Sequence, residues 1–99
     1  MTLEELTKIV QDKVGDDSGL DASIKFDLGD AGVIVVDATK VPNEVTNEDR
    51  DAQCTVKVAS EDFEAMLKGE MDPMGAFMGG KLQIDGDMSV AMKLGNVVG

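Results

Sequence analysis

The sequence has no histidine, tryptophan or tyrosine, a single cysteine, and only nine lysine and arginine residues among its 99. Without histidine it lacks the commonest general base and the commonest metal ligand, and neither a Ser–His nor a Cys–His pair is available for nucleophilic catalysis. A lone cysteine excludes an internal disulfide, which is typical of a reducing compartment. No apolar run is long enough to span a membrane, and the acidic N-terminus does not resemble a signal peptide. We therefore expect a cytoplasmic protein that is not an enzyme.

Bases are scarce beside twenty aspartate and glutamate residues, so the net charge is −11. Nucleic-acid affinity comes largely from lysine and arginine that neutralise phosphates, so we expect no nucleic-acid partner. Residues 1–62 carry 15 acids and 6 bases, net −9, whereas residues 63–99 carry 5 acids and 3 bases, net −2. The last third of the chain is thus nearly neutral. A strongly negative net charge keeps a protein soluble and monomeric. We therefore expect a monomer.

The apolar pattern predicts one α+β domain over residues 1–99, with a sheet covered on one face by helices. Strands are expected where apolar and polar residues alternate or β-branched residues cluster. The segments that meet this description are 23–28, 32–38, 52–59 and 81–85, with a short edge strand near 41–45.

Helices are predicted at four places. A T-x-x-E capping box and apolar residues at helical spacing indicate a first helix at 2–14. Ser60 is expected to be the N-cap of a second helix, and Asp72 followed by Pro73 is a start signal for a short third one. The segment 88–97 favours a last helix, with a strand as the alternative because its apolar residues also alternate.

The motifs that would carry chemistry fail in their details. Segment 75–81 approaches a phosphate-binding loop, but the next residue is leucine instead of serine or threonine, and a helix precedes it instead of a strand. Segment 47–58 begins like a calcium loop, yet it has Ala52 and Val58 where that loop needs glycine and glutamate. Cys54 alternates with valines and is expected to be a small buried hydrophobe. We therefore expect no catalytic residue, no metal ion and no cofactor.

Methionine is the distinctive residue of this chain. Six of the seven lie between Met66 and Met92, in the same nearly neutral third as Phe63 and Phe77. Methionine is flexible and polarizable, and it lines surfaces that repack around varied apolar partners. The same side chains could equally fill gaps in a thin core, and composition alone leaves both alternatives open.

The combination of motifs in the C-terminal half is specific. DFEAMLKGEMDPMGAFMGGKLQI is followed by GDMSVAMKL, and earlier in the chain IKFDL and VIVVDA occupy two predicted strands. With these motifs, the stretch Ala52–Val97 closely resembles the sterol carrier protein 2 (sterol-binding) family. The resemblance implies a five-stranded mixed sheet and an apolar tunnel between the sheet and the C-terminal helices. It also implies non-catalytic binding and transfer of fatty acids, fatty acyl-CoA, phospholipids or sterols.

The resemblance, together with the apolar periodicity, suggests which side chains line such a tunnel. They are Phe26, Val35, Met66, Met71, Met74, Phe77, Met78, Leu82, Ile84, Met88 and Met92.

The chain differs from the animal members of that family in two respects. It is much more acidic than they are, and the sequence ends in Val-Val-Gly instead of a peroxisomal S-K-L tripeptide. We therefore expect a bacterial, stand-alone, cytoplasmic member whose ligand is an acyl chain in preference to a sterol. Transient membrane contact would accompany transfer, although a net charge of −11 disfavours collision with anionic bilayers.

An anionic head group would need a positive feature at the tunnel mouth. The candidates are the helix start at Asp72 and Pro73 and the side chains of Lys68, Lys81 and Lys93. The alternative function is a non-catalytic interaction or accessory domain, in which the methionine-rich region presents acyl substrates to a partner enzyme.

Overall fold

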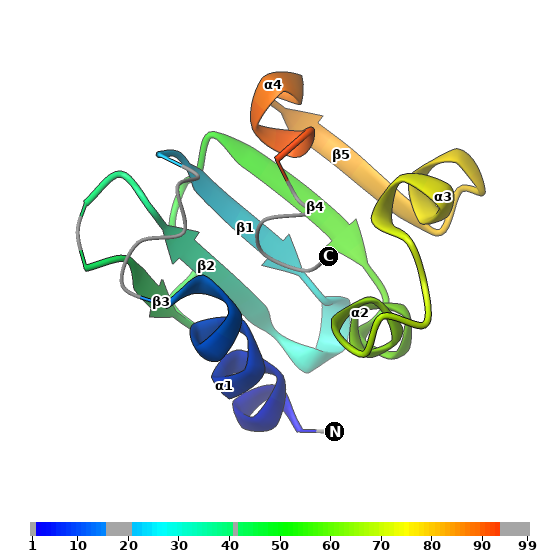
Figure 1. Ribbon diagram of the computed structural model, residues 1–99, viewed down its shortest axis with the longest axis horizontal. Coiled ribbons are helices and arrows are strands. Elements are labelled where there is room, and N and C mark those ends of the chain that lie inside the picture. The colour runs from blue at the N-terminus through cyan, green and yellow to red at the C-terminus, as the bar shows by residue number, and fades with distance from the viewer. Residues whose placement is uncertain (1, 16–20, 41, 94–99) are drawn as a thin grey trace.

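The computed structural model describes residues 2–15, 21–40 and 42–93, in which five strands form one sheet packed by helices (Figure 1). The strands are β1 (Ser23–Asp27), β2 (Val33–Asp37), β3 (Glu44–Thr46), β4 (Cys54–Val58) and β5 (Leu82–Gly86). The helices are α1 (Leu3–Val14), α2 (Ser60–Leu67), α3 (Pro73–Met78) and α4 (Met88–Ala91), with a 3₁₀ turn, η1 (Gly29–Ala31), between β1 and β2.

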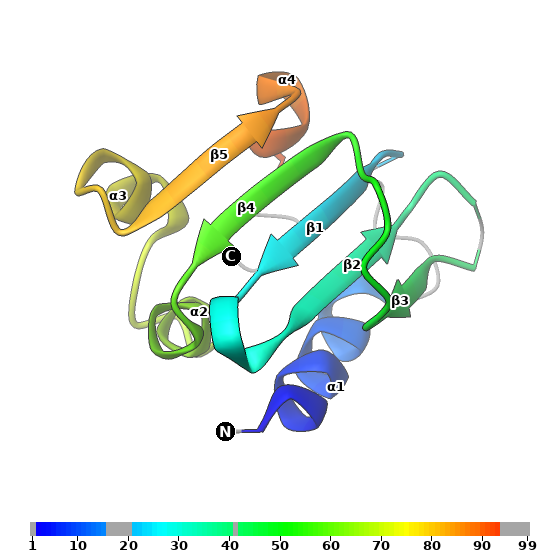
Figure 2. The same ribbon diagram turned by 180° about the vertical axis from the view of Figure 1, so that it is seen from behind.

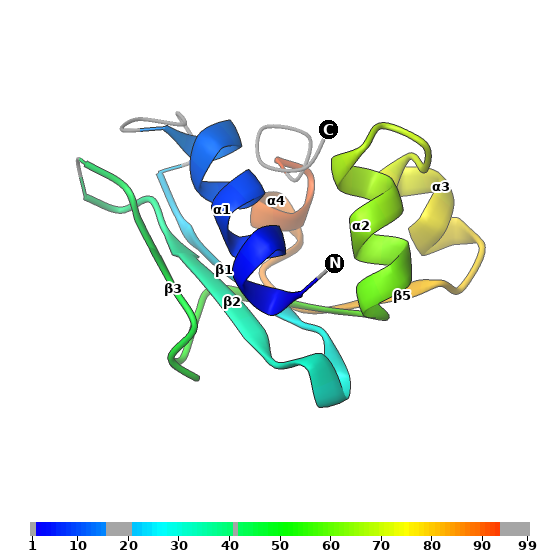
Figure 3. The ribbon, with the colours of Figure 1, turned by 90° about the horizontal axis from the view of Figure 1, so that it is seen from below.

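The order of strands across the sheet is β3-β2-β1-β4-β5. β1 and β4 run parallel and every other neighbouring pair runs antiparallel, so the sheet is mixed. Figure 3 shows α1, α2 and α4 on one side of the sheet, with α3 on the same side at the β5 edge. This arrangement confirms the predicted α+β class, the five-stranded mixed sheet and the single face covered by helices.

The first helix begins where the sequence predicts because its capping box forms. Thr2 Oγ1 accepts a hydrogen bond from the Glu5 N–H at 3.2 Å, and Glu5 Oε1 accepts one from the Thr2 N–H at 3.0 Å. The Thr7 hydroxyl also accepts from Asn47 Nδ2 at 2.9 Å. This bond ties α1 to the connection that follows β3.

The core lies between the sheet and the helices. Alternation along β1 turns Ile24 and Phe26 toward the helices, where both are almost fully buried. The Phe26 ring meets that of Phe63 on α2, with centroids 4.8 Å apart and planes tilted by 43°. Such pairs contribute about 0.5–1.5 kcal/mol beyond the burial of their area. The contact packs α2 against β1 near the end of that strand (Figure 1).

The opposite face of the sheet carries polar side chains and the connection 47–53, which passes over it (Figure 2). On this face Lys25 Nζ lies 2.7 Å from Asp49 Oδ1. Val35 is the register partner of Lys25, so it shares this face and is buried there, outside the main core. The expectation that Val35 lines a space between the sheet and the helices is therefore wrong. β2 is apolar on both faces, which left its register ambiguous in the sequence.

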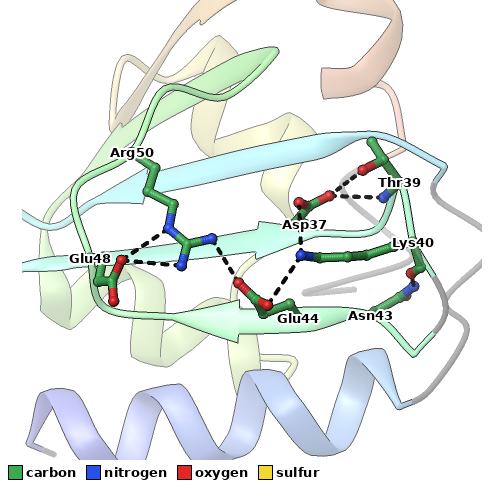
Figure 4. A network of polar contacts seen from close by, with 7 residues as sticks. All are labelled: Asp37, Thr39, Lys40, Asn43, Glu44, Glu48 and Arg50. Atoms are coloured by element: carbon green, nitrogen blue, oxygen red, sulfur yellow. Dashed lines mark hydrogen bonds and ion pairs between the residues drawn. The ribbon is translucent and has the colours of Figure 1, made fainter.

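Charged residues surround β3 at the outer edge of the sheet. Arg50 Nη1 lies 2.7 Å from Glu44 and its Nη2 lies 3.1 Å from Glu48, while Lys40 Nζ lies 3.2 Å from Glu44 and 3.9 Å from Asp37 (Figure 4). Exposed pairs of this kind contribute little stability, about 0–1 kcal/mol each. Charge on a short edge strand does, however, prevent it from pairing with other chains.

Two predicted helix boundaries need correction. Ala59 is the N-cap of α2 in extended conformation, so Ser60 is already the first helical residue and not the cap. The predicted segment 88–97 is helical only over Met88–Ala91 in the described residues. The strand alternative is wrong for those four residues, and positions 94–97 lie outside the described part of the chain.

Candidate functional site

Apart from Val35, the side chains predicted to line a tunnel belong to the helix side of the sheet and differ in how deeply they are buried. Three are buried members of the core: Phe26, Met66 and Leu82. Three more are partly buried and pack against that core: Met71, Phe77 and Ile84. The last four are exposed: Met74, Met78, Met88 and Met92.

These four exposed methionines, here called the methionine surface, are all the large hydrophobic side chains that the described residues expose. Met74 is 49% exposed, Met78 83%, Met88 50% and Met92 78%. They come from α3 and α4, which both contact β5 and stand at its two ends (Figure 1). Large apolar side chains exposed on two helices that contact the same strand make this part of the molecule the candidate binding site.

Helical spacing explains why these methionines face outward. On α3, Pro73 and Ala76 are buried against the core, so the small residues occupy the inner side of the helix. On α4, Val90 and Ala91 are buried in the same way. The flexible methionines occupy the remaining sides of both helices, with Met74 and Met78 four residues apart on one face.

The sheet is less completely covered at β5 than at its neighbour. Ile84 of β5 and Val56 of β4 are register partners on the helix side. Val56 is 1% exposed, whereas Ile84 is only partly buried. On the helix side, β5 is therefore partly exposed at Ile84, while Leu82 at its start is buried.

The positive groups expected at a tunnel mouth differ in whether they already have an anionic partner. Lys68 Nζ lies 3.0 Å from Glu64 Oε1 and is already paired. The N-terminus of α3 is capped by Asp72, whose carboxylate accepts from the Gly75 N–H at 3.1 Å, so an anion there would meet a negative charge. Lys81 has no ion-pair partner in the described residues.

Lys81 lines a surface hollow of about 530 Å³ at the end of the sheet where β1 and β4 finish and β5 begins. None of the side chains predicted to line a tunnel contributes to it. Its lining comprises Asp27, Leu28, Gly29, Lys57, Val58, Ala59, Gly80, Lys81 and Gln83. The alternation of residues 52–59 places Lys57 on the side of the strand opposite Cys54 and Val56. No pattern in the sequence indicates that Lys57 lies near Lys81.

The described residues offer little for metal or thiol chemistry. They contain no group of three or more histidine, cysteine, aspartate or glutamate side chains placed to hold a metal ion. Burial raises the pKa of the Cys54 thiol, and the carboxylates of Asp87 and Asp85 raise it further. A thiol with a raised pKa is a poor nucleophile at neutral pH. Within the same residues, no helix has the length and apolar character needed to cross a membrane.

A five-stranded mixed sheet has helices on one face, and the last two of them expose large apolar side chains, so the chain is a small α+β domain suited to an apolar ligand. The chain belongs to the SCP-2 sterol transfer family, whose model matches residues 3–99. It is thus a lipid-binding and lipid-transfer domain of that family.

Relatives in larger proteins share this domain. Human sterol carrier protein 2 is 49% identical over 51 residues, which are 52% of this chain and 9% of the human protein. Bovine hydroxysteroid dehydrogenase-like protein 2 is 36% identical over 98 residues, which cover 93% of this chain and 23% of that protein. The chain therefore spans a quarter or less of the length of these two relatives.

The fold also matches solved structures. The solution structure of palmitated SCP2L2 from Aedes aegypti aligns with a TM-score of 0.74 and 23% sequence identity, over 99% of this chain and 95% of that one. Similarity at this level of identity shows the fold alone. The expected bacterial stand-alone origin, cytoplasmic location and monomeric state stay predictions.

Proposed function

We propose that this chain is a non-catalytic carrier of fatty acids or fatty acyl-CoA, which it binds in preference to sterols. The acyl chain would lie along the helix side of β5, between α3 and α4, in contact with the methionine surface. The observation that carries the proposal is the exposure of Met74, Met78, Met88 and Met92 beside a thinly covered β5.

The buried candidates indicate how the site would open. An empty cavity costs about 24 cal/mol per Å³, so even a small ligand pocket of about 300 Å³ would cost about 7 kcal/mol. That is comparable to the whole stability of a domain, about 5–15 kcal/mol. Phe26, Met66 and Leu82 are packed in the core, so they leave no open cavity at their positions. We propose that the tunnel forms as the ligand enters, when methionine side chains change rotamer and α3 and α4 move outward.

Burial of the acyl chain would supply the binding energy. Each buried CH₂ contributes about 0.8 kcal/mol, so affinity should rise about fourfold per carbon until the site is full. A sterol is rigid and cannot adapt to a site that opens by small rearrangements. A flexible chain can, which supports the choice of acyl ligands.

The test is a calorimetric titration with saturated fatty acids of increasing chain length, on the wild type and on Met78→Asp. Met78 is 83% exposed, so its replacement should leave the fold intact while placing a charge in the acyl site. Gln11→Asp adds the same charge on the exposed side of α1 and serves as the control. We expect affinity to rise with length in the wild type and the control, and to fall at least tenfold in Met78→Asp. An affinity independent of chain length would overturn the proposal.

A second candidate function is an accessory domain that presents acyl substrates to a partner enzyme. The bovine relative favours it, since there a similar domain makes up only part of a dehydrogenase-like protein. In that case the methionine surface would contact the partner. Binding of an apolar dye to the methionine surface without any binding of fatty acid would favour this second function.

A further inference from the structure

The surface hollow at the end of the sheet lies on the face that the helices leave uncovered. Asp27, Lys57 and Gln83 stand in register on β1, β4 and β5, on the face opposite the buried Phe26 and Val56. Lys81 precedes β5 and closes the hollow on that side. Two lysines and one carboxylate thus line a hollow of about 530 Å³, which leaves it positively charged.

This positive charge is unusual in a chain with twenty acids and nine bases. Lys25, Lys40, Arg50 and Lys68 each pair with a carboxylate. Lys57 and Lys81 have no carboxylate within ion-pair distance among the described residues, although carboxylates outnumber bases by more than two to one. Asp27 also lines the hollow, but its carboxylate accepts from the Gly29 N–H at 3.0 Å.

The hollow lies within reach of the methionine surface. Met78 ends α3, and the turn of Gly79 and Gly80 leads directly to Lys81. Three residues span at most about 10 Å, so a ligand whose chain contacts Met78 can extend a polar group around this turn into the hollow. The edge strand β5 is the last in the sheet, and no further strand blocks this path in the described residues.

We propose that Lys57 and Lys81 bind the phosphate groups of an acyl ligand whose chain lies at the methionine surface; this inference depends on the proposed function. A phosphate monoester carries nearly two negative charges at neutral pH, which matches two lysines, whereas a fatty-acid carboxylate carries one. The volume of the hollow also suits a bulky phosphate-bearing group better than a carboxylate. Lys57 and Lys81 would thus favour an acyl ligand that carries phosphate over a free fatty acid.

The test compares palmitate, palmitoyl-CoA, coenzyme A and inorganic phosphate by calorimetric titration of the intact chain. The variant is Lys57→Gln/Lys81→Gln, and both side chains are exposed, so the fold should survive, which circular dichroism verifies. The matched control is Lys8→Gln/Lys13→Gln on α1, which removes the same charge from two other exposed lysines. We expect the Lys57/Lys81 variant to bind palmitoyl-CoA about tenfold more weakly, with palmitate binding unchanged, and the control to match the wild type.

Each other outcome has a definite meaning. Equal palmitoyl-CoA affinity in the wild type and the Lys57/Lys81 variant overturns the inference and leaves the proposed carrier function intact. If coenzyme A or inorganic phosphate binds as tightly as palmitoyl-CoA, and does so through Lys57 and Lys81, the hollow is a site for free phosphate compounds. The link to an acyl chain is then overturned. If palmitate and palmitoyl-CoA both fail to bind, the carrier function and the inference fail together.

Discussion

At the scale of single residues, Gly86 is the described glycine at which an added Cβ would be most crowded. Its φ is +113°, and an added Cβ would lie 2.5 Å from the Gln53 carbonyl oxygen and 3.2 Å from Cys54 Cα. The same carbonyl accepts the Asp87 N–H at 2.9 Å, so the contact also fixes the start of α4. Gly86 therefore holds the end of β5 against β4 and, through α4, one side of the methionine surface.

We expect Gly86→Ala to lower the free energy of unfolding by about 3 kcal/mol, since both a steric clash and an unfavourable φ contribute. The matched control is Gly69→Ala, where φ is +76° but nothing lies within 4 Å of the added Cβ. That variant should lose only about 1 kcal/mol. Urea unfolding followed by circular dichroism measures both values, and equal losses would show that the close approach at Gly86 has no energetic role.

At the scale of elements, the start of α1 depends on a reciprocal pair of hydrogen bonds. Hydrogen bonds from the backbone and the side chain of Thr2 lower the pKa of Glu5. We expect Thr2→Ala to lower the free energy of unfolding by about 1 kcal/mol at pH 7, because the Glu5 N–H loses its acceptor. Urea unfolding of the wild type and the variant at neutral pH measures the difference.

The same pair makes α1 sensitive to acid. The pKa of Glu5 is lower in the folded state than in the unfolded state, so its contribution is complete above the ordinary glutamate pKa. This contribution disappears as the pH falls through the lowered folded value. Glu5→Gln keeps a hydrogen-bond acceptor but cannot titrate, so its unfolding free energy should fall less steeply over that acidic range. Parallel pH profiles for Glu5→Gln and the wild type would contradict this account.

Elements with strong local signals were predicted from the sequence, and the failures have physical causes. Alternation gave β1 and β4, and the capping box gave α1. β2 is apolar on both faces, so no local pattern indicates which face of the sheet Val35 occupies. The start signal at Asp72 and Pro73 predicted α3, but it could not show that Ala76 lies inside and Met78 outside, because that depends on how the helix packs on the sheet.

The hollow could not be predicted at all. It brings together the ends of β1 and β4 and the beginning of β5, segments that lie far apart in the sequence. Only the parallel pairing of β1 with β4 places these ends side by side. Non-local pairing of this kind leaves no trace in short sequence windows.

At the scale of the whole molecule, net charge acts against compactness. The molecule measures 33 × 28 × 23 Å and carries a net charge of −11. In 0.01 M salt the screening length is about 30 Å, so each carboxylate repels others across the entire molecule. At 0.15 M the length falls to about 8 Å, and only near neighbours still interact. The attractive pairs around β3 are close neighbours and contribute little when exposed, so screening removes more repulsion than attraction.

We therefore expect the midpoint of thermal unfolding to rise by about 5 °C when sodium chloride is raised from about 0.01 M to about 0.15 M, a gain of about 1 kcal/mol. The control is Asp12→Asn/Asp30→Asn, which removes two exposed carboxylates and should show a smaller rise, since less repulsion remains to be screened. Sucrose at equal osmolality tests for an effect of the cosolute itself. If the midpoint falls with salt, exposed ion pairs outweigh the net charge.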